Sequence, residues 1–326
     1  MGDQSKLERW ATAYGRFITS VATNNSDEVL AYISGELSEV EVDFEHGFRF
    51  EGTDSNRATV ISLLYLAADG VEFVGDASTP LAYGQWRINC EEPNPSFEVG
   101  NYGIQFALSS LGSIDSGVIF SETFLYCTHS VDFDLKGATV IDCGAFVGDT
   151  ALFFAKQGAT VYAVEPYPKN IQVLTQNLEL NPELASRICV CEHAIGPDGT
   201  LVFDIIDDTI DGGGRVLDKR GSDTLQSVSV DCLTLSSFLQ RNNITRAELA
   251  KLDIKGRELD LLAQEDLSCF RNVHIEYHLQ QSEHVTVDSL LDKLTSMGFC
   301  SRVAKHNVAY YPLRSHGSIY AFNSSW

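Results

Sequence analysis

From about Lys136 onward, the sequence predicts an α/β fold in which helices cover both faces of a parallel β-sheet. Three observations lead to this fold class. Short apolar strands alternate with amphipathic helices, a glycine-containing turn follows the first strand, and an acidic residue ends the second. Sheets of this kind bind ligands at the carboxyl ends of their strands, near the switch in strand order.

The first 125 residues predict a mixed α/β segment without an internal repeat. Spaced apolar residues indicate an amphipathic helix over residues 6–34, and partial alternation indicates a strand within residues 37–52. A further helix is expected over residues 57–69, and strands are expected over residues 71–75 and 97–107.

The remainder of the chain alternates regularly between strand and helix. Strands are expected over residues 138–143, 160–165, 188–195, 249–254, 273–277, 299–304 and 317–322, and helices over residues 148–157, 168–180, 233–241, 257–264 and 285–297. The polar stretch 198–230 contains Asp207, Asp208 and Asp211-Gly-Gly-Gly214. It predicts the tip of a hairpin. The alternative is a lid that closes over a bound substrate.

Composition excludes several classes of partner and site. The chain has 326 residues and a formal net charge of −22, which disfavours nucleic acid and anionic membrane surfaces. Eight cysteines without CxxC spacing predict buried reduced thiols and no zinc ribbon. The first residues lack the apolar core of a signal peptide, and no stretch reaches 18 apolar residues. We therefore expect a cytoplasmic protein that is not inserted in a membrane.

The turn after the first strand and the acid after the second predict a nucleoside-binding site. Gly144 permits a tight turn, Gly148 opens a helix whose amino end carries a positive dipole, and Asp142 ends the strand. Glu165 follows 23 residues later, where a carboxylate accepts hydrogen bonds from ribose hydroxyls. A dinucleotide site would require GxGxxG, and Phe146 stands at its middle glycine. The acidic turn instead favours the cationic methyl donor S-adenosylmethionine.

The ordered motifs of residues 120–326 resemble those of the FkbM-type methyltransferases. The motifs are Asp142-Cys-Gly-Ala-Phe-Val-Gly-Asp-Thr150, Val164-Glu-Pro166, His193-Ala-Ile-Gly196 with Asp198-Gly199, Leu233-Thr-Leu-Ser-Ser-Phe-Leu239 and Lys251-Leu-Asp-Ile-Lys-Gly-Arg-Glu258. This resemblance implies a class I Rossmann-like methyltransferase fold, a mostly parallel seven-stranded sheet with a terminal antiparallel strand. It also implies S-adenosylmethionine as the cofactor and a hydroxyl acceptor on a sugar, glycolipid or polyketide-like small molecule.

The resemblance also assigns the donor-binding residues. They are Asp142, Gly144, Ala145, Gly148, Asp149 and Glu165, together with His193 and Ala194 over the adenine. Two positions depart from the family pattern. Phe146 stands where the family usually has Asn, which is expected to alter the donor pocket, and Lys255 replaces a Glu, which bears on acceptor binding.

Catalytic residues are expected on the strand that contains His274-Ile-Glu-Tyr-His278. The period of two places His274, Glu276 and His278 on one face, where burial is costly without a purpose. We expect His278 to remove the hydroxyl proton, assisted by Glu276 or Asp253. Asp253 has a helix N-cap as its alternative role. No metal site is predicted, although two histidines and a carboxylate are common metal ligands.

The predicted organisation is an N-terminal segment over residues 1–120 and a methyltransferase domain over residues 121–326. The N-terminal segment is expected to build an acceptor wall or a contact between copies in a homo-oligomer. His129 could approach the donor tail, although surface or core pairing is the favoured interpretation. Two alternative functions stay open on the sequence, a non-catalytic binding protein with this fold and an NAD-dependent oxidoreductase.

Overall fold

A seven-stranded β-sheet forms the centre of the computed structural model, which describes residues 15–75, 80–205, 210, 226–254, 258, 261–262, 265–278, 286–304 and 316–326. In spatial order its strands are β15 (Phe299–Ala304), β16 (His316–Asn323), β14 (Phe270–His278), β13 (Ala247–Leu252), β7 (Thr139–Cys143), β8 (Thr160–Val164) and β9 (Ile188–Cys191). The five strands from β14 to β9 are parallel, and β16 runs antiparallel to both of its neighbours. The predicted class I methyltransferase fold is confirmed.

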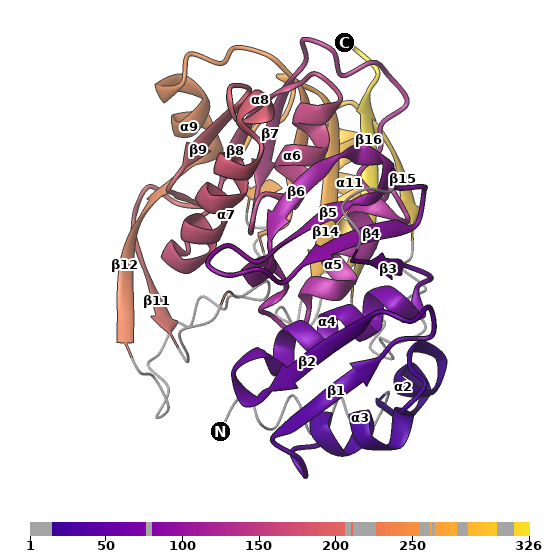
Figure 1. Cartoon of the computed structure of the whole chain (residues 1–326). Helices are drawn as coiled ribbons and strands as arrows, with labels where there is room; N and C mark the ends of the chain where they lie inside the picture. The colour runs from indigo at the N-terminus through magenta and orange to yellow at the C-terminus, as the bar shows by residue number, and fades with distance from the viewer. Residues whose placement is uncertain are drawn as a thin grey trace.

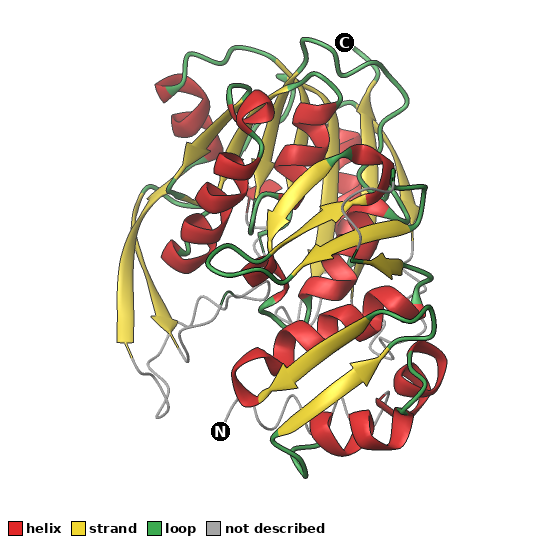
Figure 2. Cartoon of the chain, viewed as in Figure 1, coloured by secondary structure: helices red, strands yellow, loops and turns green. Residues whose placement is uncertain are grey.

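Helices cover both faces of this sheet, as Figure 2 shows. One face is covered by α5 (Ser116–Phe124), α6 (Asp149–Lys156), α7 (Pro168–Leu180) and α8 (Pro182–Ala185). The other is covered by α9 (Leu235–Arg241) and α11 (Val287–Ser296). Each side has its own apolar core, because alternate residues of every strand point to opposite faces.

The N-terminal region lies beside the first of these faces (Figure 1). It consists of α2 (Arg16–Ala22), α3 (Ser26–Ile33), β1 (Glu39–Asp43), β2 (Arg49–Thr53), α4 (Arg57–Ala68), β3 (Glu72–Val74), β4 (Gln85–Asn89), β5 (Ser96–Val99) and β6 (Ile104–Ala107). Its buried side chains belong to the same apolar core as Val140, Val161 and Leu249 of the large sheet. At Gly117 of α5, a Cβ would lie 2.6 Å from the Ser62 carbonyl oxygen of α4, so glycine allows these two helices to approach closely.

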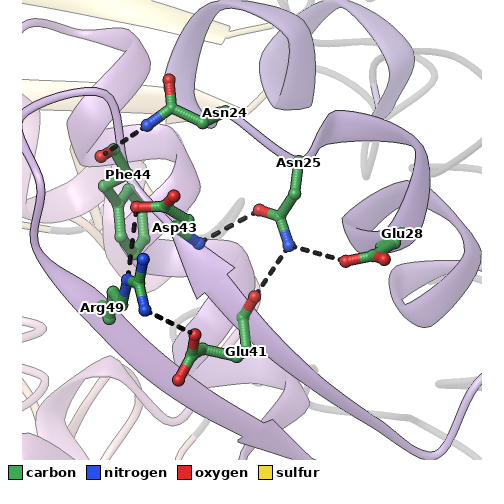
Figure 3. A network of polar contacts seen from close by, with 7 residues as sticks. All are labelled: Asn24, Asn25, Glu28, Glu41, Asp43, Phe44 and Arg49. Atoms are coloured by element: carbon green, nitrogen blue, oxygen red, sulfur yellow. Dashed lines mark hydrogen bonds and ion pairs between the residues drawn. The ribbon is translucent and has the colours of Figure 1, made fainter.

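One predicted helix in this region is two helices. The part of residues 6–34 that the structure describes forms α2 and α3, which are separated at Thr23–Asn25. The Asn25 amide explains the break, because it donates to the Glu41 carbonyl oxygen (2.8 Å) and to Glu28 (3.0 Å) and accepts from the Asp43 backbone (3.0 Å; Figure 3). These bonds fasten the helix junction to β1. The spacing of apolar residues does not show that a side chain competes with the helix for backbone hydrogen bonds.

Turn chemistry divides other predicted elements. Residues 37–52 form the hairpin of β1 and β2, and residues 97–107 form β5 and β6 around a short 3-10 turn. The strand expected over residues 188–195 is β9 followed by β10 (Ala194–Ile195). The sequence pattern does not predict β4 or α5. Their sequences, QWRIN and SGVIFSETF, are too short or too uniformly apolar to show a clear period.

The polar stretch after β10 contributes an antiparallel ribbon. β11 (Gly199–Ile205) pairs with β12 (Gln226–Leu233), and the ribbon extends away from the main sheet at the left of Figure 1. The Asp207, Asp208 and Asp211-Gly-Gly-Gly214 tip lies outside the described residues. Within the described part of the chain, no helix has the length and apolar character needed to cross a membrane.

Two asparagines near the end of α7 join the N-terminal region to the methyltransferase fold. Asn177 is fully buried and accepts from the Ala107 backbone (2.8 Å), while it donates to the Val147 carbonyl oxygen (2.8 Å). Asn181, the residue after α7, accepts from the Gln105 backbone (3.0 Å) and donates to the Gln105 carbonyl oxygen (2.6 Å). The two carboxamides therefore satisfy the backbone of β6 along one edge.

Candidate active site

The turn between β7 and α6 is a tight backbone crossing that requires glycine. Gly144 has a φ of 80°, and a Cβ on it would lie 2.1 Å from the Asp253 carbonyl oxygen at the end of β13. Gly148 has a φ of 84° and precedes the first residue of α6. Ala145 between them is fully buried. The carboxyl ends of β7 and β13 therefore come as close as the backbone allows.

Asp142 lies beneath this turn with both carboxylate oxygens engaged. The Thr150 hydroxyl donates to Oδ2 at 2.6 Å, and the Lys251 Nζ lies 3.0 Å from Oδ1. The same Nζ donates to the Gly144 carbonyl oxygen at 2.9 Å. Both side chains are buried, so water screens this ion pair little.

Lys251 belongs to a polar row that crosses five strands. Asp142 of β7 is in register with Lys251 of β13, which is in register with His274 of β14. His274 is opposite Tyr320 of β16, and Tyr320 is opposite Arg302 of β15. Residues in register point to the same face, here the face beside the N-terminal region. We call these five residues the polar row.

Glu165 at the end of β8 is held by backbone donors of the same turn. The Phe146 N–H donates to Oε2 and the Tyr167 N–H to Oε1, both at 2.9 Å, and Asn170 adds a bond at 3.2 Å. Burial raises the pKa of Glu165 to about 7, against the effect of these donors. A carboxylate has about four lone-pair sites, so capacity for a ribose hydroxyl is left on Oε2.

Phe146 has left-handed backbone, with a φ of 48°, and its ring is buried in the apolar core that contains Phe153 and Leu174. The left-handed conformation is common for Asn and uncommon for a bulky residue. The structure thus gives a reason for the Asn that the family usually has here. The ring of Phe146 compensates by packing into the core, while its N–H keeps the bond to Glu165.

Asp149 begins α6 and is buried with the Thr123 hydroxyl, which donates to Oδ2 at 2.8 Å. Burial raises the pKa of Asp149 to about 7, and Lys251 acts in the opposite direction. The side chain therefore changes protonation state near neutral pH. Thr123 comes from α5, so this contact ties α5 to the turn.

His193 follows the next strand, β9, and its Nδ1 is buried without a hydrogen-bond partner among the described residues. Ala194 is buried in β10, where it pairs with Cys232 of β12. Because β7, β8 and β9 are adjacent and parallel, their carboxyl ends bring the Gly144 turn, Glu165 and His193 to one edge of the sheet.

The predicted catalytic residues belong to the strands on the other side of β7: Asp253 follows the neighbouring strand β13, and Glu276 and His278 lie on the next strand, β14. The Asp253 backbone N–H donates to the Cys143 carbonyl oxygen at 3.1 Å, which places Asp253 beside the Gly144 turn. Glu276 is partly buried on β14, on the face of the polar row. The side chain of His278 lies outside those that the structure describes. Lys255 lies outside the described residues. The alternative role of Asp253 as a helix N-cap also depends on residues outside the described part, those that follow Ile254.

His274 is packed within the polar row. Its ring packs edge-on against Tyr320 at a centroid distance of 4.5 Å, and it is buried. Burial, reinforced by Arg302, lowers the pKa of His274 to about 3. The residue is therefore neutral in the folded protein at physiological pH.

Two further residues interact with the site residues, and the sequence pattern assigns neither of them to the site. They are Lys251, which belongs to one of the family motifs, and His129, for which surface or core pairing is the favoured interpretation. Burial and Lys251 lower the pKa of His129 to about 3, while Glu276 and Asp253 act in the opposite direction. One signal is present for Lys251, a single charge inside the apolar run Leu249-Ala-Lys-Leu252. His129 gives no such signal, because only the fold brings it to β13 and β14.

Residues 142–300 match the model of the methyltransferase FkbM domain. Over these residues, the chain is similar to the FkbM methyltransferase domain. The enzyme class and the S-adenosylmethionine cofactor are thereby confirmed, and the matched domain gives no support to an NAD-dependent oxidoreductase. A search of curated proteins finds no match.

Several solved structures are similar to the chain at low identity. Magnesium protoporphyrin IX methyltransferase from Synechocystis PCC 6803 has a TM-score of 0.38 and 13% identity over 64% of this chain and 79% of that chain. Precorrin-6y C5,15-methyltransferase from Geobacter metallireducens GS-15 has a TM-score of 0.35 and 13% identity over 58% and 81%. Trm5b from Pyrococcus abyssi has a TM-score of 0.39 and 12% identity over 73% and 63%.

The residues at this edge of the sheet fit the donor. A side chain at Gly144 would fill the turn, Glu165 keeps an acceptor site, and the buried His193 Nδ1 has no partner among the described residues. The carboxylates of Asp149 and Asp253 have the sign that a sulfonium and an ammonium require. Among the described residues, no three His, Cys, Asp or Glu side chains are grouped to hold a metal ion.

Proposed function

We propose that the chain is an O-methyltransferase that acts on a hydroxyl of a small molecule or glycan, with a sugar-type acceptor. The observation that supports this is the acidic and imidazole group beside the donor turn. His129 lies within electrostatic reach of Lys251, Glu276 and Asp253, which belong to β13, to β14 and to the end of β13. A hydroxyl oxygen becomes a good nucleophile only when a base takes its proton.

The donor-binding roles follow from the same geometry. Glu165 would accept from the ribose hydroxyls, and His193 Nδ1 would accept from the adenine amine. Asp149 and Asp253 would lie toward the cationic tail. The Gly144 turn, with Ala145 and Gly148, would give the donor its close backbone approach.

S-adenosylmethionine supplies a methyl group on a positively charged sulfur. The contribution of the chain is to align the acceptor oxygen with that methyl carbon and to remove the proton. We propose His278 as the base, assisted by Glu276, which lies on the same strand β14, or by Asp253. His129, neutral at physiological pH, would hydrogen-bond the acceptor hydroxyl or the base.

Other parts of the proposal concern the surroundings of this site. The N-terminal segment 1–120 would provide an acceptor wall or a contact in a homo-oligomer, with residues 121–326 as the catalytic domain. The net charge of −22 supports an acceptor other than nucleic acid and a cytoplasmic location away from anionic lipid.

Donor binding is tested by calorimetric titration with S-adenosylhomocysteine and, separately, with NAD. Wild type should bind the first in the micromolar range and not the second. Glu165→Ala should weaken binding of S-adenosylhomocysteine at least tenfold, since hydrogen bonds to a charged group contribute about 1.5–3 kcal/mol. Glu179→Ala, an exposed position on α7, is the matched control. NAD binding alone would contradict the proposal.

The acceptor class is tested with radiolabelled S-adenosylmethionine and matched acceptor pairs, glycans or lipid-linked sugars with one hydroxyl free or already methylated. Label should enter only the free-hydroxyl member of a pair. Glu276→Gln should lower kcat about 10²–10⁴-fold, with the donor Kd unchanged. Label that enters amines or carboxylates instead would reject O-methylation. If Glu276→Ala and His278→Ala both keep full turnover, the base is elsewhere.

A further inference from the structure

Lys251 places a buried ammonium on one face of β13, and its neighbours in the strand point to the other face and are apolar. Its neighbours Ala250 and Leu252 are fully buried, and Lys251 itself is 5% exposed. A buried lysine normally loses its charge, because burial favours the neutral form. Here the opposite holds. Burial lowers the pKa of Lys251, but Asp142, Asp253 and Asp149 more than reverse that effect and raise the pKa above its usual range.

The ammonium holds the donor turn at two points. It lies 3.0 Å from Asp142 Oδ1, and it donates to the Gly144 carbonyl oxygen at 2.9 Å. The Asp253 carbonyl oxygen leaves no room for a Cβ on Gly144. Residues of β13 therefore set where the turn after β7 can lie.

The Lys251 ammonium is the counter-charge for several acidic groups around the Gly144 turn. The titratable groups around Lys251 come from the elements packed against it: Asp142 of β7, Asp149 of α6, Glu165 of β8, Asp253 at the end of β13, His274 of β14 in register with Lys251, and His129 after α5. With Asp142 paired to Lys251, the remaining carboxylates are left for a cationic ligand. Without the ammonium, these groups would repel one another and take up protons.

We propose that Lys251 is a positioning residue of the donor site, which pairs with the Asp142 carboxylate and fixes the carbonyl of Gly144 so that the turn has the shape that receives the donor. The inference rests on the proposed donor-binding role of that turn. Lys251 touches neither the donor nor the acceptor in this scheme. It acts through Asp142 and Gly144.

The test is the Kd of S-adenosylhomocysteine for Lys251→Met and wild type, measured by calorimetry from pH 6.5 to pH 8.5. Methionine matches the length of lysine and lacks the charge. At pH 7 the variant should bind at least tenfold more weakly. The ratio of its Kd to that of wild type should fall as pH rises, because the unpaired carboxylates then ionise. Taking the ratio at each pH cancels the titration of the ligand.

Two matched variants separate positioning from a general structural role. Lys251→Arg keeps the charge and should restore the pH profile of wild type. Leu252→Met, on the same strand and the opposite face, should bind within twofold of wild type at every pH. If Lys251→Met does not fold, the double variant Lys251→Met with Asp142→Asn removes both buried charges. It should still bind weakly, because the Gly144 carbonyl oxygen has lost the ammonium that donates to it.

The outcomes are distinct. Equal binding by wild type and Lys251→Met, or by wild type and the double variant, overturns the inference and leaves the donor site intact. A loss for Lys251→Met that is uniform across pH also overturns it, because that is the signature of general damage to the fold. Failure of wild type to bind S-adenosylhomocysteine overturns the proposed donor site and this inference together.

Discussion

The two faces of the large sheet are built from the same strands and both bury an apolar core, but only one of them also carries a row of polar and ionisable side chains. Beneath α9 and α11, the residues that face the core are apolar: Ile141, Cys143, Ala250, Leu252, Val273, Ile275 and Ile319. Beside the N-terminal region, the positions between them form the polar row. The first face stabilises the fold through burial of apolar area. The second retains ionisable groups, whose burial is unfavourable unless they are paired.

The largest expected effect comes from replacing one buried residue on each face, Lys251 on one and Leu252 on the other, and comparing the losses of stability. Lys251→Ala should lower the free energy of unfolding by about 3–5 kcal/mol, because it leaves buried carboxylates without a counter-charge. Leu252→Ala should cost about 2–5 kcal/mol through lost packing. Urea denaturation at pH 6 and pH 8 distinguishes them. Only the loss at Lys251 should grow with pH, and parallel losses would contradict the assigned roles.

Asp149 provides the next largest effect. Its pKa in the folded protein is raised to about 7, so its contribution is most favourable below its unfolded pKa and is lost as pH rises through 7. Each pH unit that separates the folded pKa from the unfolded pKa corresponds to about 1.4 kcal/mol. Between pH 5 and pH 8, wild type should therefore lose roughly 2–4 kcal/mol that Asp149→Asn does not lose. Superimposable pH profiles of unfolding would reject this.

His274 should show the opposite sign. Its pKa in the folded protein is lowered to about 3, so the folded state cannot take the proton that the unfolded chain accepts below about pH 6.5. Stability from this residue is present at neutral pH and is lost on acidification. Between pH 7 and pH 5, His274→Phe should lose about 1–2 kcal/mol less than wild type. Thermal unfolding in matched buffers measures the difference.

Arg302, at the end of the polar row, should have the smallest effect. Its guanidinium lies 4.7 Å from the centre of the Tyr320 ring and is exposed to solvent. Arg302→Met should cost about 0.5–1 kcal/mol, the usual value of an exposed cation–π contact. Arg241→Met on α9 is the control, because Arg241 is exposed on the other face. An equal loss of unfolding free energy at both sites would show that the contact between Arg302 and Tyr320 contributes nothing of its own.

Sequence predicts the parts of the fold and site that local pattern determines. The parallel strands, the Gly144 turn and Glu165 each have a period, a glycine or a chain position that indicates their place. The polar row cannot be predicted in this way, because it depends on register between strands far apart in the chain, such as β7 and β13. The contacts of His129 and Thr123 escape prediction for the same reason. Side-chain competitors such as Asn25 also leave no trace in a hydrophobic period.

The two asparagines near the end of α7 have a consequence for the behaviour of the chain as a folding unit. β6 is the last strand of its four-stranded sheet, and an open strand edge of this kind is a template for pairing with another molecule. Asn177 and Asn181 occupy that edge and close it with carboxamides instead of a further strand. The helix that lies on the nucleoside-binding sheet thus also protects its neighbour from intermolecular pairing and aggregation.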